Sequence, residues 1–299
     1  HMKKKAGVTR PIQMEFARMM REDYTITNAC EFLHEHFLWR KPRKRGTWGY
    51  FAQHMDRVLV HGQAEFTVFA DGNMKLPFKA FSNLPIVTCP GAGECKDYCY
   101  SLKAWRYPAA FFRQCQNLWL LRHAPSILRN EFLKFEQGIT FRLYVDGDFH
   151  DLEAMKFWFD LLKERPDIQC YGYSKSWELF LRWNARHLYL DDETFKNRFP
   201  VNYKLNLSNG SIYDQEMRKQ VQELPCTRGN FVAVDIPKES DAPIGARTNI
   251  YRKAVRQAAK LAGYGKAFVC PGQCGTCTPK GHACGLDTFS DINIAIGVH

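Results

Sequence analysis

Two short, widely separated stretches of the chain hold seven of its 11 cysteines. The first group is Cys89, Cys95 and Cys99, and the second is Cys270, Cys274, Cys277 and Cys284. Clustered thiolates are soft ligands, which suit zinc or iron–sulfur centres rather than hard cations. The glycines in both stretches allow a loop to fold around such a centre and to turn backbone N–H groups toward the sulfurs. The sequence therefore predicts a thiolate-bound metal centre.

Cysteine spacing favours iron–sulfur clusters over zinc. Structural zinc sites typically show two C-x2-C pairs, and only Cys274 and Cys277 have that spacing here. Three thiolates leave one iron of a [4Fe–4S] cluster open, whereas four can close a second cluster. We expect one or two [4Fe–4S] clusters, or one cluster with ligands from both groups; a zinc-stapled interaction protein is the alternative. The isolated Cys30, Cys115, Cys170 and Cys226 are expected to be small buried apolar residues.

Polar residues follow three predicted strands. The catalytic candidates are Asp146, Asp148 and Lys175, because carboxylates bind cations or transfer protons and a lysine holds an anion as a point charge. The candidate cofactor-binding residues are Gly147, Asp148, Tyr173, Ser174, Asn206 and Ser208. The alternatives are that Asp148 only caps the next helix, that Lys175 is simply solvated, and that His150 is a surface or cap residue.

Apolar periodicity predicts the elements that position these residues. We expect helices within 11–40, with Asn28 starting a second one, and over 108–130, 152–162, 177–187 and 247–262. A β-hairpin is expected over 66–81, and strands over 84–88, 141–145, 168–173, 203–207 and 231–234. Strands that alternate with helices imply parallel βαβ units, here a partial or closed (β/α) barrel in an α/β fold. Chemistry in such folds lies at the carboxyl ends of the strands, where the first cysteine group and Asp146 fall.

The expected organisation has three parts. They are an N-terminal helical, basic extension (1–62), a barrel-like core (63–265) and a C-terminal cysteine-rich, cluster-binding segment (266–299). No apolar run approaches membrane-spanning length, so we expect a cytoplasmic protein without a membrane partner. Clustered cysteines in a reducing compartment are more often metal ligands than disulfides. The sequence leaves the oligomeric state open.

The formal net charge of +11 suggests a polyanionic partner, for which nucleic acid is the leading candidate. Basic residues neutralise phosphates, and neighbouring aromatic side chains stack on unpaired bases. The candidate contacts form a first basic group, 40–45, and a second, 252–256. They are Arg40, Lys41, Arg43, Lys44 and Arg45 in the first, and Arg252, Lys253 and Arg256 in the second. The alternative is that both groups are merely solvated faces.

Several motifs occur in a fixed order along the chain. They are Thr88-Cys89-Pro90-Gly91 with Cys95, Cys99 and Tyr100, then Asp146-Gly147-Asp148-Phe149, Tyr171-Gly172-Tyr173-Ser174-Lys175, Asn206-Leu207-Ser208 and the C-terminal cysteines. This order resembles the gene product 88 family of phages and other mobile elements. The resemblance spans roughly residues 65–285 and implies a mobile-element origin and a bound cluster, without specifying a reaction. Together with the positive net charge, it leads us to expect a cluster protein that works on or near nucleic acid in a regulatory or redox-sensing role.

A more distant likeness is to radical S-adenosylmethionine (SAM) enzymes. Their three-cysteine loop follows the first barrel strand, and an acidic motif after the second strand receives the SAM amino group; Gly147 and Asp148 hold that place here. The family spacing is C-x3-C-x2-C, whereas Cys89, Cys95 and Cys99 read C-x5-C-x3-C. Cys270, Cys274 and Cys277 have the family spacing but lie at the wrong end of the chain, so barrel order favours the first group as the SAM site and spacing favours the second. The likeness implies a radical enzyme with an open [4Fe–4S] cluster and SAM as the alternative function.

Overall fold

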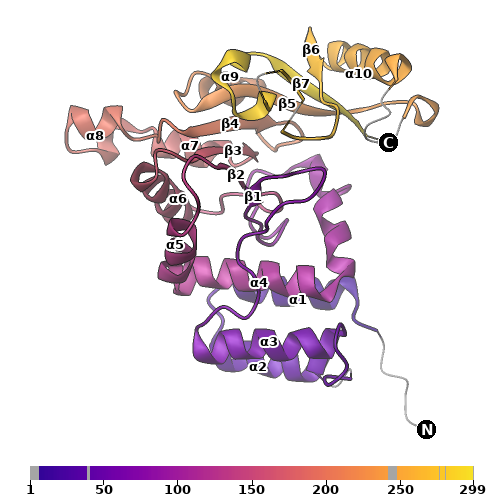
Figure 1. Cartoon of the computed structure of the whole chain (residues 1–299), viewed down its shortest axis with the longest axis vertical. Coiled ribbons are helices and arrows are strands. Elements are labelled where there is room, and N and C mark those ends of the chain that lie inside the picture. Colours follow the sequence, from indigo (N-terminus) through magenta and orange to yellow (C-terminus); the bar gives the residue numbers. More distant parts are fainter. Residues whose placement is uncertain (1–6, 39–40, 242–247, 276, 280, 299) are drawn as a thin grey trace.

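A seven-stranded, fully parallel β-sheet forms the centre of the computed structural model, which describes residues 7–38, 41–241, 248–275, 277–279 and 281–298 (Figure 1). The strands lie in the order β1-β2-β3-β4-β5-β7-β6. Their bounds are β1 Lys79–Ala80, β2 Thr140–Leu143, β3 Gln169–Ser174, β4 Tyr203–Ser208, β5 Thr227–Asp235, β6 Ala267–Val269 and β7 Asn293–Val298. The first five strands follow chain order, as expected for successive βαβ units.

Ten α-helices occur among the described residues. They are α1 Arg10–Arg21, α2 Ile26–Leu33, α3 Trp48–His61, α4 Pro108–His123, α5 Pro125–Leu133, α6 Leu152–Glu164, α7 Trp177–Trp183, α8 Asp192–Lys196, α9 Gln215–Gln222 and α10 Asn249–Leu261. Caps fix several of the helix starts. Thr47 accepts a hydrogen bond from the Tyr50 amide at α3, and Asp151 accepts one from the Ala154 amide at α6.

The two faces of the sheet are covered differently. Phe141, Tyr203 and Leu205 belong to the main hydrophobic core with α4 to α7, and Val232 and Val234 pack with α10, so the helices cover one face. Alternate residues point to the opposite face, which we call the inner face. The inner face carries Arg142, Tyr171, Tyr173, Lys204, Asn206, Ser208, Phe231 and Ile294, which the strand registers place side by side.

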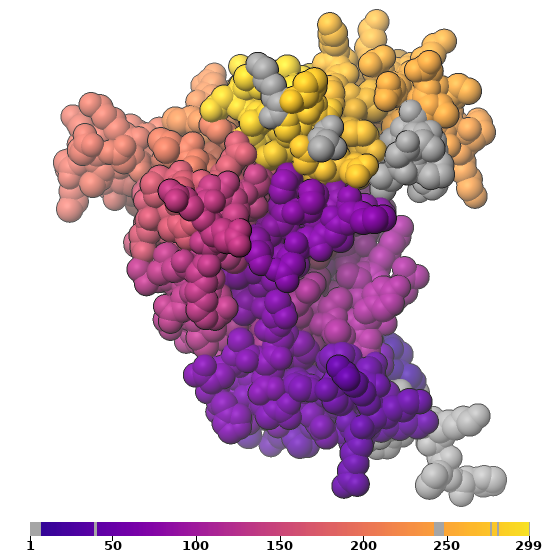
Figure 2. Space-filling model, viewed as in Figure 1, coloured from indigo at the N-terminus to yellow at the C-terminus, as the bar shows by residue number. Residues whose placement is uncertain are grey.

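The C-terminal segment from Cys270 onward covers the inner face. Cys284 packs with Tyr171 and Ile294 in a third hydrophobic cluster. The segment also rests on the loop before β1, because the Cys274 amide donates to the Lys75 carbonyl at 2.8 Å. Figure 2 shows the C-terminal segment lying directly against this earlier part of the chain. Its last strand, β7, inserts between β5 and β6.

The N-terminal helices share the main core. Phe16 of α1, Leu33 of α2 and Val58 of α3 are buried in the same cluster as Phe112 of α4. In Figure 1 these helices stack below the sheet, on the side away from α10. Among the helices of the described residues, none has the length and apolarity needed to cross a bilayer.

Several predicted elements differ from the structure. The predicted strand 84–88 is wrong: Ile86 has a positive φ of 69° and the segment forms turns, so β1 is the strand that precedes the first cysteine group. The predicted hairpin over 66–81 is reduced to one antiparallel bridge between Ala70 and Ala80. Asn28 does not start α2, because Thr25 is the capping residue and accepts from the Asn28 amide.

Helix lengths were also over-predicted in two places. Ala124 and Pro125 divide the predicted helix 108–130 into α4 and α5, since proline cannot continue the hydrogen-bond ladder. The predicted helix 177–187 ends as α7 at Trp183. A closed barrel is wrong as well, because the sheet has two free edges, β1 and β6. The α/β class and the parallel sheet are confirmed.

Candidate metal centre

The first cysteine loop follows β1 and is anchored on the loops after β3 and β4. A Cβ atom on Gly91 would lie 1.6 Å from the Lys175 carbonyl oxygen, so only glycine fits there. The Gly93 amide donates to the Gly210 carbonyl at 3.0 Å, and the Ile212 amide donates to the Gly91 carbonyl at 3.0 Å. The loop therefore lies across the carboxyl ends of two strands, as the sequence predicts.

The thiols of the first group lie in one loop. Burial raises the pKa of Cys89 and of Cys95, and the nearby Cys99 raises both further. The Lys175 ammonium acts in the opposite direction on both thiols. Cys99 and Lys175 are therefore close enough to Cys89 and Cys95 to act on them electrostatically.

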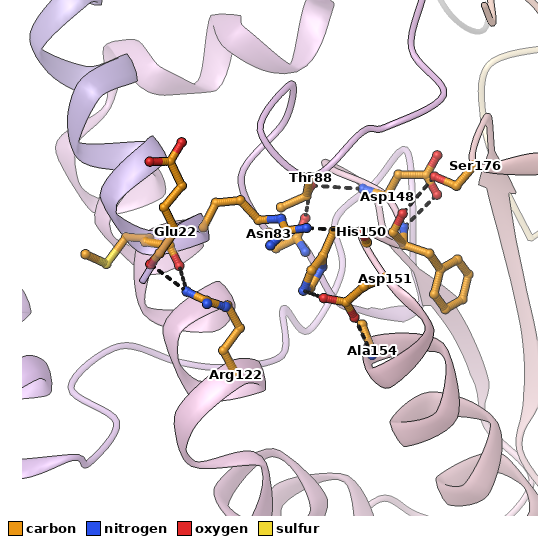
Figure 3. Close-up of polar contacts among 12 residues, drawn as sticks. Glu22, Asn83, Thr88, Arg122, Asp148, His150, Asp151, Ala154 and Ser176 are labelled. Atoms are coloured by element: carbon orange, nitrogen blue, oxygen red, sulfur yellow. Dashed lines mark hydrogen bonds and ion pairs between the residues drawn. The ribbon is translucent and has the colours of Figure 1, made fainter. Parts of the chain in front are cut away.

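Asp148 joins the first cysteine segment to β3. Its carboxylate accepts hydrogen bonds from the Ser174 hydroxyl at 2.7 Å and from the Lys175 amide at 2.8 Å. Its own amide donates to the Thr88 hydroxyl at 3.2 Å, and Figure 3 shows Thr88 and Asp148 facing each other. Asp148 is 4% exposed, and burial raises the pKa of its carboxyl group. It does not cap α6, which is the role of Asp151.

Gly147 allows the segment that carries Asp148 to pack against Asn83 and Thr88. It has a φ of +77°, and a Cβ there would lie 1.6 Å from Asn83 Oδ1 and 2.7 Å from Thr88 Oγ1. Asp146, beside it, accepts a hydrogen bond from the Gln114 amide group at 3.0 Å. His150 is 6% exposed, so its prediction as a surface or cap residue is wrong; Figure 3 shows it beside Asp151, whose carboxylate lies 3.4 Å from His150 Nε2.

Of the other predicted strand-end residues, Lys175 lies near the first cysteine group and Asn206 contacts the second. Lys175 Nζ donates to the Ser208 hydroxyl at 2.8 Å, which holds the cation near Cys89 and Cys95. Asn206 is fully buried and donates to the carbonyls of Gly172 and Cys284 at 3.1 and 2.9 Å. Asn206 thus ties the second cysteine group to the sheet.

The second cysteine group lies on the inner face and also interacts internally. Burial raises the pKa of Cys284 to about 12, with Cys270 and Cys274 among the contributing neighbours. Burial likewise raises the pKa of Cys277, and Cys274 adds to the effect. Two backbone amides donate to sulfur, Gly272 to Cys270 and Ala283 to Cys277, each at 3.3 Å. Such N–H···S bonds stabilise thiolates that bind iron.

A buried arginine fixes the C-terminal segment in place. Arg228 is fully buried and donates to Asn206 Oδ1, to the Phe289 carbonyl at 2.7 Å and to the Ile292 carbonyl at 2.8 Å. Lys204 adds an ion pair with Asp287 at 2.5 Å. These contacts cross from β4 and β5 to the cysteine-rich segment, so the second group has a fixed position on the sheet.

Among the described residues, no three His, Cys, Asp or Glu side chains are arranged to hold a single metal ion. Ligands of one zinc ion must converge on a point, so this part of the chain contains no preformed site of that kind.

Two inner-face residues near the second group were missed from the sequence. Arg142 lies in β2 with its guanidinium 4.8 Å from the Tyr173 ring centre. His282 has its ring 4.7 Å from Tyr171, and burial lowers its pKa to about 4. The alternation Phe141-Arg142-Leu143 was the available signal, because it places a charge on the face opposite two core residues.

The two basic groups lie far apart. Lys41, Arg43, Lys44 and Arg45 are exposed in the loop before α3, and Arg40 lies outside the described residues. Arg252, Lys253 and Arg256 are exposed on α10. Figure 1 shows α3 and α10 at opposite ends of the molecule, so the two groups do not form one continuous surface.

The family model for gene product 88 matches residues 57–286. The chain belongs to the gene product 88 family. The match includes both cysteine groups and every strand-end motif described above, so the site is part of the gene product 88 region. Neither the curated proteins nor the solved structures include a significant match to the chain.

Proposed function

We propose that this gene product 88 protein is an iron–sulfur protein of a mobile element, with one [4Fe–4S] cluster in each cysteine group. The main support is that both cysteine loops are anchored to the same sheet. Within the loops, Cys99 is a neighbour of Cys89 and Cys95, and Cys274 is a neighbour of Cys277 and Cys284. The first group would leave one iron open, and the second would be fully ligated. The amide–sulfur bonds in the second group would stabilise bound thiolates, and the spacing of the cysteines along the sequence favours clusters over zinc.

Nucleic acid is the proposed partner. The net charge of +11 and the exposed basic groups before α3 and on α10 support this choice. In this proposal the clusters have a structural or redox-sensing role, and binding depends on the folded, cluster-loaded protein.

Metal analysis of protein purified without oxygen tests the cluster proposal. We expect iron and acid-labile sulfide in equal amounts, with loss of one cluster in the variant Cys89→Ala/Cys95→Ala/Cys99→Ala. The matched control is Cys30→Ala in α2, far from both groups in sequence, which should retain all the iron. Colourless protein with stoichiometric zinc would instead establish the zinc-stapled alternative.

A radical SAM enzyme is the second candidate function. It is favoured by one observation, that the three-cysteine loop follows β1 and lies over the carboxyl ends of β3 and β4. The open iron would bind SAM and supply the radical chemistry. The Asp148 carboxylate is already hydrogen-bonded within the protein, so the SAM amino group would need another acceptor.

Reductive cleavage of SAM separates the two candidates. The radical enzyme predicts that dithionite-reduced protein produces 5′-deoxyadenosine, and that SAM changes the spectrum of the reduced cluster. Neither change should occur in the triple cysteine variant. If the loaded parent shows neither change, the radical enzyme is rejected and the non-catalytic role remains.

A further inference from the structure

The guanidinium of Arg142 lies on the inner face between the two cysteine groups. Strand register pairs Arg142 with Ala80 on one side and Tyr171 on the other. Tyr100, which follows Cys99, and Cys274 of the second group both interact electrostatically with it. Arg142 therefore links the surroundings of the two thiol sets.

This cation has no carboxylate partner among the described residues. The groups that act on it electrostatically are tyrosines and Cys274, and its Nε is buried without a hydrogen-bond acceptor. The contact that it does make is with the face of the Tyr173 ring. Burying a charge without a partner is costly, so proteins retain such an arrangement where a ligand supplies the opposite charge.

A further donor lies beside the guanidinium. The Tyr171 hydroxyl, on the residue paired with Arg142 in the sheet, is buried and forms no hydrogen bond of normal geometry with a described group. A free hydroxyl next to a guanidinium is a combination that recognises an oxyanion.

The place is open to a ligand. Tyr100, which follows Cys99, is 62% exposed. Arg142 and Tyr173 are themselves only partly buried, so a solute can reach them.

We propose that Arg142, with the hydroxyl of Tyr171, binds an oxyanion group, a phosphate or a carboxylate, of a ligand that lies between the two cysteine groups. This inference deepens the proposed function, because it names the substrate or effector class that the cluster site would receive. The planar fork of arginine suits bidentate binding of either group, and lysine would not replace it fully.

Isothermal titration with inorganic phosphate and with acetate tests the site and distinguishes the two ligand classes. The protein is the anaerobically purified parent, with Arg142→Gln, Arg142→Lys, Tyr171→Phe and, as control, Arg182→Gln at an exposed site on α7. We expect one of the two anions to bind the parent, with affinity reduced about tenfold or more in Arg142→Gln, corresponding to about 1.4 kcal/mol. Arg142→Lys and Tyr171→Phe should show smaller losses, and the control none.

Iron content measured on the same samples separates failure of this inference from failure of the cluster proposal. Anion binding by a parent that contains no iron would support the oxyanion site and reject the clusters. An iron-loaded parent that binds neither anion would overturn the oxyanion site alone. Loss of iron in Arg142→Gln with unchanged anion affinity would also overturn it, since the guanidinium would then serve to balance cluster charge.

Discussion

Near the first cysteine group, a polar residue that the sequence marks as a candidate site residue also supports the fold. Asp148 was predicted from its place after a strand, and that place is correct. Its carboxylate nevertheless points into the protein, where it holds Ser174 and the Lys175 amide. Sequence position gives the strand end, but the direction of the side chain depends on residues 27 positions away that only the fold brings near.

Replacement of Asp148 tests its structural role. We expect Asp148→Ala to lower the free energy of unfolding by about 3 kcal/mol, because hydrogen bonds to a buried carboxylate are lost and their donors remain buried. The matched control, Asp146→Ala, loses one bond from Gln114 and should cost about 1 kcal/mol. Urea unfolding measures both. Equal stabilities of Asp148→Ala and the parent would instead assign the carboxylate to ligand binding.

His150 should make the protein sensitive to acid. Burial lowers its pKa to about 4, against 6.5 for an exposed histidine. Between these values the unfolded chain binds a proton that the folded protein does not, so the free energy of unfolding falls as the pH falls from 6.5 to 4. The loss is up to about 3 kcal/mol.

Urea unfolding across this pH range measures the effect. His150→Gln should flatten the pH dependence, while His187→Gln, at an exposed site, should not alter it. An unchanged slope in His150→Gln would contradict the assignment of the acid sensitivity to this side chain.

At the level of elements, the alternation of strands and helices was readable from the sequence, and the strand ends were mostly correct to within one or two residues. The exceptions are informative. Segment 84–88 has the apolar composition of a strand, but Asn83 and Thr88 must contact Gly147 and Asp148, which requires turns instead. Strands β6 and β7 were missed because each is short or separated from its neighbours by the cysteine-rich segment.

The close contact of Gly147 with Asn83 and Thr88 gives a prediction at the level of elements. Gly147→Ala should destabilise the protein by about 2 kcal/mol more than Gly138→Ala. Both glycines have positive φ values, of 77° and 75°, but only the Cβ at 147 would clash with other residues. The difference between the two variants therefore isolates the clash from backbone strain. Equal unfolding midpoints would show that Asn83 and Thr88 can move aside.

The anchoring of the first cysteine loop at Gly91 gives a second prediction at the level of elements. Gly91→Ala would place a Cβ against the Lys175 carbonyl, so we expect the variant to fold with the first cluster missing. Iron content and the visible absorption spectrum measure this, with Gly138→Ala as the control that retains full iron. Full cluster content in Gly91→Ala would mean that the loop does not need this contact.

For the whole molecule, the sheet topology explains how residues nearly 200 positions apart form one region. Each cysteine group was predictable from spacing, but their attachment to the same sheet was not, because it depends on β7 returning between β5 and β6. Arg142 and Arg228 were missed for the same reason: a charged residue within a strand has no evident partner until the C-terminal segment covers the inner face.

The separated basic groups predict the form of nucleic-acid binding. Replacing Lys41, Arg43, Lys44 and Arg45 with glutamine should weaken binding of single-stranded DNA and reduce the slope of log K against log salt by about 3. Replacing Arg252, Lys253 and Arg256 should act independently and reduce it by about 2. Fluorescence anisotropy at several salt concentrations measures both slopes. Identical slopes in parent and variants would contradict phosphate contact by these residues.

The most direct measurement is the iron and acid-labile sulfide content per chain of protein purified without oxygen, for the parent and for Cys89→Ala/Cys95→Ala/Cys99→Ala. Two [4Fe–4S] clusters predict about eight irons and eight sulfides in the parent and about four of each in the variant. A well-folded parent that contains zinc but neither iron nor sulfide would contradict the account.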